Sequence, residues 1–398
     1  MSERRMNLRL VYQWLSAVLL FFLWRSVFQQ FFGAMLPRLT HLGAAGLRIN
    51  DRPCECPQCD FSGFWPAGLL ARAHRLDVLF NPDAFLAFRH AVFSPAAESV
   101  RWFYPPPTLL PVAAISYLPF EAAFWAWSAL MVLASAAMLR RAGLSYAVIG
   151  LALLSPAALW NFEMGQMGTV MGCLLVGGLL AVETAQREGG ALLGLLVIKP
   201  QYGILVPFFL AARGRWLGLL AGGLVAGGIV ALTTALFGFG VWQAYAHLGV
   251  AVSRAVLEAP PNGCNYEKFG VSVFWMLRSF GVGLSFAYFW QTMAIIFALG
   301  FGLFTWRRGG LTPVDRMART VFLSLLATPY GYSDDMVAWS VALAALTERR
   351  AWRLGVFDAL FWLWPMLCPV IAARTGLVLT PLVVMMALAR EEVLGHTA

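Results

Sequence analysis

Residues 216–238 read WLGLLAGGLVAGGIVALTTALFG, a continuous apolar stretch without a charged side chain. About 20 such residues in an α-helix are enough to cross the roughly 30 Å of hydrocarbon in a bilayer. Comparable full-length runs recur near residues 11–32, 121–139, 146–162, 167–183, 284–306, 318–331, 335–347, 356–372 and 376–390. The sequence therefore predicts an all-α integral membrane protein of about 10–12 transmembrane helices, with residues 1–398 forming a single polytopic domain.

The composition points to lipid as the solvent of this chain. Hydrophobic residues make up 60% of it and charged residues 12%, and the mean hydropathy is +0.70. A soluble domain carries about 25% charged residues to cover its surface. The pI of about 9.6 does not indicate a nucleic-acid partner, because the basic residues lie in short clusters between the apolar runs.

Those arginine clusters also predict the orientation of the chain. If the N-terminus is cytoplasmic, they all fall on the cytoplasmic side, as the positive-inside rule requires. The clusters are Arg4, Arg5 and Arg9; Arg140 and Arg141; Arg213 and Arg215; Arg307 and Arg308; and Arg349, Arg350 and Arg353. Two long loops, residues 33–104 and 239–270, then lie outside. The run 11–32 is too long for the core of a cleaved signal peptide, so it is expected to remain as an anchor.

Three shorter apolar runs are predicted to line a cavity. Prolines bracket residues 108–120, Lys199-Pro200-Gln201 interrupts residues 191–212, and the third run is 271–283. Short or broken helices are tolerated at membrane depth only where protein or water satisfies the freed backbone groups. The arginine clusters share one side only if 108–120 is re-entrant and 191–212 forms a hairpin.

The clearest candidate for chemistry is Asp60, in the sequence Asp60-Phe61-Ser62-Gly63-Phe64-Trp65-Pro66-Ala67-Gly68 of the first long loop. A carboxylate near the membrane surface can act as the general base that deprotonates a sugar hydroxyl. An aromatic side chain such as Trp65 can stack on a sugar or lie at the level of the lipid headgroups. The alternative is a surface acid beside an interfacial aromatic anchor.

Lys199, followed by Pro200 and Gln201, lies inside an apolar stretch. A lysine in hydrocarbon costs at least about 2.5–3.5 kcal/mol, so it is usually paired or functional. A phosphate would satisfy its charge, and the proline would expose backbone groups to the same site. The alternative is a lysine whose side chain extends to the membrane interface.

Three further polar segments lie beside predicted helices. Arg101-Trp102-Phe103-Tyr104 leads into three prolines, which favours a rigid entry into a helix over direct contact with a substrate. Asn161-Phe162-Glu163-Met164-Gly165-Gln166 offers polar groups to a sugar, or forms a turn between helices. The block from Thr328 to Asp335 includes Tyr332 and two adjacent acids, which could bind a divalent cation. Nothing nearby completes an oxygen cage, so a polar helix turn is favoured there.

Cys54, Cys56 and Cys59 lie just before Asp60. Three closely spaced thiols suggest zinc, but a fourth ligand is not evident. In an extracytoplasmic loop a disulfide is the simpler interpretation, with Cys264 as a candidate partner. Cys173 and Cys368 lie in apolar runs and are expected to pack there. The sequence predicts neither a bound metal nor a cofactor.

Four of these blocks, in this order, resemble glycosyltransferase family 87, a group within the membrane-embedded GT-C class. The blocks are Asp60-Phe61-x-x-Phe64-Trp65-x-Ala67-Gly68, Tyr104-Pro105-Pro106, Asn161-x-x-x-Gly165-Gln166 and Lys199-Pro200-Gln201. No block is specific alone. The resemblance covers residues 58–215 and becomes thin through the C-terminal helices.

The resemblance implies a GT-C-like helical bundle with extracytoplasmic juxtamembrane helices in the first long loop. It also implies inverting transfer of a hexose, mannose first, or a pentose from a polyprenyl-phosphate-linked sugar donor. The acceptor would be a glycolipid or glycan of the cell envelope. The reaction would take place at the outer face of a bacterial inner (plasma) membrane.

The same resemblance assigns roles to single residues. Asp60 matches the family's catalytic acid, and Lys199 is our candidate for stabilising the leaving phosphate. Donor or substrate contacts are expected from Gln201, Gln166, Tyr104, Arg101, Trp65, Tyr332 and Asp335. The segment from Tyr330 to Asp335 lacks the histidine that the family often has there, and the cysteine cluster is a second departure.

The competing interpretation is a polytopic lipid or sugar transporter or flippase, which broken helices and a buried lysine would also suit. Transporters usually bind their substrate near the membrane midplane, whereas this chain carries an acid in a long external loop. A non-catalytic membrane scaffold would tolerate replacement of both Asp60 and Lys199.

Overall fold

The computed structural model describes residues 60–93, 100–260 and 266–395, together with several positions of a helix between residues 11 and 25. Helices dominate this part of the chain, and a β-bridge between Gly270 and Tyr332 is its only extended pairing. The predicted all-α membrane fold is confirmed.

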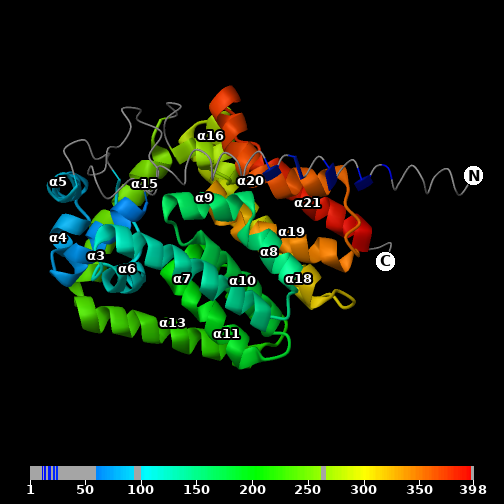
Figure 1. The fold of residues 1–398 in the computed structure, drawn as a ribbon, viewed down its shortest axis with the longest axis horizontal. Coiled ribbons are helices and arrows are strands. Elements are labelled where there is room, and N and C mark those ends of the chain that lie inside the picture. The colour runs from blue at the N-terminus through cyan, green and yellow to red at the C-terminus, as the bar shows by residue number, and fades with distance from the viewer. Residues whose placement is uncertain are drawn as a thin grey trace, which may run out of the picture.

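The helices at one end of the molecule come from the first long loop and the segment that follows it (Figure 1). They are α3 (Phe61–Arg72), α4 (Leu76–Leu79), α5 (Pro82–Val92), the 3-10 helix η2 (Pro106–Thr108) and α6 (Leu109–Ile115). Two hydrogen bonds fasten α3 to the end of α6, from Trp65 Nε1 to Leu118 O (2.9 Å) and from Arg72 Nη1 to Ser116 O (2.9 Å). The helices predicted in the first loop are therefore present as α3 to α5.

The remaining elements form the helical bundle and the second long loop. The first set is α7 (Phe120–Arg141), α8 (Tyr146–Leu153), α9 (Pro156–Met164), α10 (Gly168–Ala181), α11 (Gln186–Gly194), η3 (Leu195–Ile198), η4 (Pro200–Tyr202), α12 (Val206–Ala212) and α13 (Trp216–Phe237). The second set is α14 (Gly240–Ala244), the π-helical turn η5 (Tyr245–Gly249), α15 (Val250–Glu258), η6 (Tyr266–Phe269), α16 (Val273–Ser279), α17 (Leu284–Arg307), α18 (Pro313–Ala327), η7 (Ser333–Met336), α19 (Val337–Arg349), α20 (Val356–Thr375) and α21 (Thr380–Gly395).

Four of the described helices, α7, α13, α17 and α20, are long and apolar enough to cross a membrane. A fifth span results if α8 and α9, which are bent by 51°, are taken as one. The bend has a cause in the sequence. Ser155 caps α9 by accepting a hydrogen bond from the Ala158 N–H, and Pro156 has no N–H with which to continue α8.

Shorter helices form the centre of the bundle. The runs 167–183, 318–331 and 335–347 were predicted as full-length spans, but their helices α10, α18 and α19 have only 14, 15 and 13 residues. All three are buried along nearly their whole length. Because protein rather than lipid surrounds them, their backbone ends are enclosed by neighbouring helices and their length need not match the bilayer.

The segment 191–212 reverses direction, as the sequence predicts. α11 and η3 lead up to Lys199, and η4 and α12 lead back from it. Glu183, just before α11, forms an ion pair of 2.5 Å with Arg215, just after α12, so both ends of the hairpin lie at the same end of the molecule. Pro200 sets the reversal point, because the residue before a proline is excluded from helical geometry.

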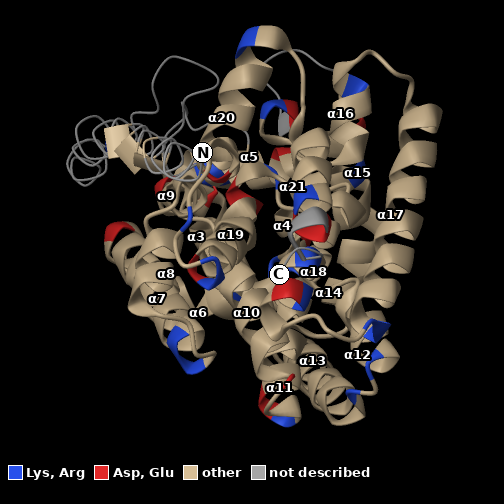
Figure 2. Ribbon diagram, turned by 90° about the vertical axis from the view of Figure 1, so that its right-hand side faces the viewer, with Lys and Arg blue, Asp and Glu red and all other residues tan. Residues whose placement is uncertain are grey.

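Several groups of ion pairs cover that end, opposite to α3–α6. The pairs are Glu183 with Arg215 and Arg316, Glu188 with Arg141, Asp315 with Arg349, Asp358 with Arg350 and Arg390, Glu391 with Arg350, and Glu392 with Arg308 and Arg319. Figure 2 looks onto this end and shows acidic and basic residues side by side on α11, α18 and α21. The arginine clusters that the structure describes therefore share one side, whereas the cluster from Arg4 to Arg9 lies outside the described residues.

α11 and α13 approach each other backbone to backbone. A Cβ atom added to Gly190 would meet the backbone of Gly218, and one added to Gly194 would meet the carbonyl of Gly222. Each helix thus carries two glycines four residues apart, the small-residue spacing that lets membrane helices pack closely. On another face of α13, a Cβ added to Gly228 would have nothing within 4 Å.

We predict that Gly190→Leu destabilises the protein, because the new side chain must push α11 away from α13. Overpacking of this kind costs about 1–3 kcal/mol. The measurement is the midpoint temperature of unfolding in detergent, followed by fluorescence-detected size-exclusion chromatography. Gly228→Leu is the matched control, and an equal loss of stability in both variants would contradict the close packing of the two helices.

Candidate functional site

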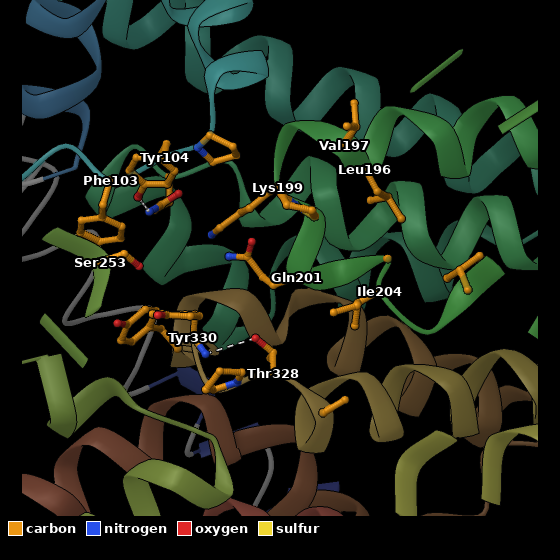
Figure 3. A pocket seen from close by; sticks show the side chains of 18 of the residues that line it. Phe103, Tyr104, Leu196, Val197, Lys199, Gln201, Ile204, Ser253, Thr328 and Tyr330 are labelled. Atoms are coloured by element: carbon orange, nitrogen blue, oxygen red, sulfur yellow. Dashed lines mark hydrogen bonds between the residues drawn. The ribbon is translucent and has the colours of Figure 1, made fainter. Parts of the chain in front are cut away.

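A cavity of about 980 Å³ lies between the end of the molecule that carries α3 and the Lys199 hairpin. Its polar arm is lined by Asp60, Gln166, Lys199 and Asp334. Its apolar arm follows η3, α12 and the glycine-bearing faces of α11 and α13, with Leu196, Val197, Ile204, Leu210, Gly194 and Gly222 among its lining residues. Figure 3 shows Lys199 and Gln201 between the two arms.

Asp60 lies immediately before α3, where its backbone carbonyl accepts hydrogen bonds from the N–H groups of Gly63 and Phe64. Its side chain does not cap the helix, so the carboxylate is available to the cavity. There it accepts a hydrogen bond of 3.0 Å from Gln166 Nε2. The same amide donates to the hydroxyl oxygen of Tyr104 over 2.7 Å. Three of the sequence blocks therefore meet at one point.

A tight turn between α9 and α10 positions Gln166. Gly165 adopts a left-handed conformation with φ of 66°, and its carbonyl accepts a hydrogen bond from Trp127 Nε1 (3.0 Å). A Cβ at this position would lie 2.5 Å from Cβ of Phe61. Glycine is thus required both for the backbone angle and for the close approach of α3.

The Asp60 carboxyl is suited to accept a proton. It lies just before α3 and is not part of any helix that is long enough to cross a membrane. Burial raises its pKa above the ordinary value, although the hydrogen bond from Gln166 and the charge of Lys199 act in the opposite direction. A carboxylate of raised pKa is a stronger base than one in water.

Lys199 is buried and paired within the protein. Its Nζ lies 2.5 Å from Oδ1 of Asp335, and the hydroxyl of Tyr202 donates to the same oxygen over 2.8 Å. The other carboxylate oxygen accepts a hydrogen bond from the backbone N–H of Tyr332. Lys199 is only 3% exposed, so the alternative of a side chain extending to the interface is wrong.

Asn161 fastens the turn before α10 to η7. Its Nδ2 donates to the carbonyl oxygens of Ala157 and Asp334, and its Oδ1 accepts from the N–H of Thr169. Its polar atoms are therefore bound to backbone, and the interpretation of Asn161 as a sugar ligand is replaced by a structural role. Of this sequence block, Gln166 is the polar residue whose hydrogen bond reaches Asp60.

The other predicted site residues divide between the cavity and the protein interior. Arg101, Tyr104, Gln201 and Tyr332 line the cavity, and their contacts with a substrate stay a prediction. Trp65 and Asp335 do not line it. Trp65 packs against Phe93 and Phe120 on another face of α3, and its N–H is bound to Leu118 O. Asp335 points inward and neutralises Lys199.

Several lining residues were not chosen as site residues from the sequence. Phe103, Thr328, Tyr330 and Asp334 lie in segments that the sequence analysis considered, whereas Ser253 does not. Figure 3 places Phe103, Tyr104 and Ser253 together on one side of the cavity, with Tyr330 and Thr328 below them. The adjacency of Asp334 and Asp335 was noted only as a weak cation motif. Lys199 can neutralise only one of these two adjacent acids, and this difference in charge would have drawn attention to Asp334.

No group of three or more His, Cys, Asp or Glu side chains that could hold a metal ion is present among the described residues. Cys173 and Cys368 are free and buried, as predicted. Cys54, Cys56, Cys59 and Cys264 lie outside the described residues, so the disulfide and zinc alternatives both stay predictions.

Comparison with known proteins identifies one family. The model of Glycosyltransferase family 87 matches residues 102–329, which is more than half of the chain. No curated protein and no solved structure matches. The resemblance was expected over residues 58–215 and thin beyond them, whereas the match begins after Asp60 and extends through α18.

We predict that breaking the Lys199–Asp335 pair from either side destabilises the protein. Lys199→Ala and Asp335→Ala each leave one buried charge without its partner, which typically costs about 3–5 kcal/mol. The double variant Lys199→Met/Asp335→Leu removes both charges and should recover most of the unfolding temperature while remaining inactive. Arg254→Ala, which breaks the exposed pair with Glu258, is the control and should have little effect. A double variant as unstable as the single variants would contradict this interpretation.

Proposed function

We propose, from the premise that the chain belongs to glycosyltransferase family 87, that it transfers a sugar from a polyprenyl-phosphate donor to a hydroxyl of a glycolipid or glycan. The family supports a membrane glycosyltransferase. The identity of the donor and of the acceptor belongs to our proposal. So does the transferred sugar, which we propose to be a hexose, most favourably mannose, or a pentose. So does the location, at the outer face of a bacterial inner membrane.

One observation supports the proposal most strongly: a partly buried acid lies where a polar arm of the cavity joins an apolar one. A lipid-linked sugar has the same division, with a sugar and phosphate at one end and a hydrocarbon chain at the other. The polar arm fits the sugar and phosphate, and the apolar arm, lined by Leu196, Val197 and Ile204, fits the hydrocarbon chain. A free nucleotide sugar would leave the apolar arm unused.

The proposed reaction is a single displacement with inversion. Asp60 removes the proton of the acceptor hydroxyl, whose oxygen attacks the anomeric carbon. The bond from that carbon to the phosphate oxygen breaks, and its electron pair stays on the phosphate. The products are the glycosylated acceptor and polyprenyl phosphate, and the proton is held by Asp60.

A departing phosphate needs stabilisation of its charge more than it needs an acid. Lys199 is the proposed source of positive charge, although Asp335 already offsets it. The phosphate would therefore become the third member of this cluster rather than the sole partner of the lysine. The amide of Gln201, at the centre of the cavity in Figure 3, is a further proposed donor to the phosphate or the sugar.

The acceptor is proposed to enter on the side of Phe103, Ser253 and Tyr330. Phe103 and Tyr104 stack with ring centroids 5.3 Å apart and an angle of 9° between their planes. Aromatic rings and hydroxyls are the usual surfaces for the apolar faces and hydroxyl groups of a sugar. This side of the cavity therefore suits a carbohydrate acceptor.

We predict that Asp60→Asn abolishes transfer while donor binding survives. Asparagine keeps the size of the side chain and the contact with Gln166 but cannot take a proton at neutral pH. The measurement is release of polyprenyl phosphate from a panel of polyprenyl-phosphate sugars by purified protein, with donor affinity determined in parallel. Asp77→Asn, an exposed acid on α4, is the matched control. Full activity of Asp60→Asn would remove the general-base role.

The proposed orientation has its own test. We expect a cysteine at Arg75, beside α4, to react with a membrane-impermeant maleimide on intact cells, and a cysteine at Gly309, beyond α17, to stay protected. The background needs replacement of Cys54, Cys56, Cys59 and Cys264 only, because Cys173 and Cys368 are buried. The reverse labelling pattern would place Asp60 in the cytoplasm and overturn the proposed donor.

A further inference from the structure

Asp334 is a buried acid that the proposed reaction leaves unused. Its side chain lines the cavity, yet the residue is only 6% exposed. Apart from its own backbone N–H, no group in the described part of the chain hydrogen-bonds to its carboxyl. Buried polar groups are normally satisfied, so an acid held open toward a cavity indicates a ligand.

The backbone around Asp334 is fixed from two sides. Asn161 donates to its carbonyl oxygen, and the absence of a side chain at Gly168 leaves room for that contact. The next residue, Asp335, donates its N–H to the carbonyl of Tyr332 over 2.9 Å. This 3-10 turn sends the Asp335 carboxylate inward to Lys199 and leaves the Asp334 carboxyl on the cavity wall.

The charges in this region do not balance if every acid is ionised. Asp60, Asp334 and Asp335 lie close enough to Lys199 and to one another for their charges to interact. Three carboxylates and one ammonium have a net charge of −2, and a donor phosphate would add more. Like charges at short range in a site of low dielectric repel by several kcal/mol, so one acid must hold a proton.

Asp334 is the acid best placed to stay neutral. Asp335 forms the ion pair with Lys199, and Asp60 must be ionised to act as the base. Burial and the neighbouring Asp335 carboxylate raise the pKa of Asp334 to about 8. The titratable groups on the other elements packed against this turn, besides Lys199, are Tyr202 on η4, Glu163 on α9, Cys173 on α10, Asp358 and Arg374 on α20, and Glu348 and Arg349 at the far end of α19.

We propose that Asp334 is a neutral carboxylic acid in the resting site and donates its O–H to a non-bridging oxygen of the donor phosphate. This inference rests on the proposed function, because it assumes a phosphate beside Lys199. A neutral carboxylic acid can donate a hydrogen bond to an anion, whereas an ionised one repels it. The two adjacent acids thus have opposite tasks: Asp335 offsets the lysine, and Asp334 binds the phosphate.

The hydrogen bond strengthens as the reaction proceeds. When the bond between the anomeric carbon and the phosphate oxygen breaks, its electron pair increases the negative charge on the phosphate. A donor directed at developing charge stabilises the transition state more than the ground state. The proton remains on Asp334 throughout, and the acceptor's proton goes to Asp60, so no further reactant is required.

Two substitutions of Asp334 distinguish a neutral hydrogen-bond donor from an ionised carboxylate. Asp334→Asn keeps a neutral hydrogen-bond donor of nearly the same shape, and Asp334→Ala removes the donor. The probe is farnesyl phosphate, whose binding is measured by calorimetry between pH 6.5 and 9.5 on protein with an unchanged size-exclusion profile. A phosphate monoester has its second pKa at about 6, so binding changes above pH 8 report on the protein.

We expect the affinity of the unmodified chain to fall by up to about tenfold for each pH unit above the pKa of Asp334. Asp334→Asn should bind like the unmodified chain at pH 6.5 and lose this alkaline decline. Asp334→Ala should bind about tenfold or more weakly at pH 6.5. Asp77→Asn should retain both the affinity and the decline. An alkaline decline that persists in Asp334→Asn, or an Asp334→Asn as weak as Asp334→Ala, would overturn the proposal.

The outcome can be separated from that of the proposed function. If farnesyl phosphate binds with the expected pH dependence but no lipid-linked sugar releases polyprenyl phosphate, the phosphate site stands and the transfer reaction falls. If transfer occurs at the same rate in the unmodified chain and in Asp334→Ala, the role of Asp334 falls and the transferase stands.

Discussion

A lysine and a carboxylate buried 2.5 Å apart, Lys199 and Asp335, hold the hairpin of α11–α12 against the turn between α18 and α19. Neither charge is tolerable there alone, because an isolated ion in a dry interior costs several kcal/mol. The pair therefore fixes two broken segments that have no regular helix to position them. Two further side chains connect this junction to the rest of the site. Asn161 joins the same turn to α9 and α10, and Gln166 joins α10 to Asp60.

The apolar runs predicted the class of fold because the thickness of hydrocarbon sets a minimum length for a spanning helix. The same reasoning failed for α10, α18 and α19, which are shorter than a span. Hydropathy measures whether a helix avoids water and does not distinguish burial in lipid from burial in protein. The break at Lys199-Pro200 was predictable from the sequence, because proline and charge both disfavour a continuous helix in hydrocarbon.

The candidate site was predictable where the chemistry of a residue leaves few alternative roles for it in an apolar sequence. Asp60, Tyr104, Gln166 and Lys199 were chosen from separate blocks, and the structure brings them to one cavity. The direction of a side chain was not predictable. Trp65 turns away because it lies on the face of α3 that packs on Phe120. Which of two adjacent acids pairs with the lysine depends on a 3-10 turn whose geometry is set by contacts with α9.

The arrangement of acids links the two halves of the proposed reaction. Asp60 feels the charges of Lys199 and Asp335, and Asp334 feels all three. A phosphate bound beside Lys199 would add negative charge to this group. Its field would favour the protonated form of each neighbouring carboxyl, which keeps Asp334 a hydrogen-bond donor and makes Asp60 a stronger base. Binding of the donor would thus prepare the base that activates the acceptor, so an acceptor hydroxyl arriving before the donor would meet a weaker base.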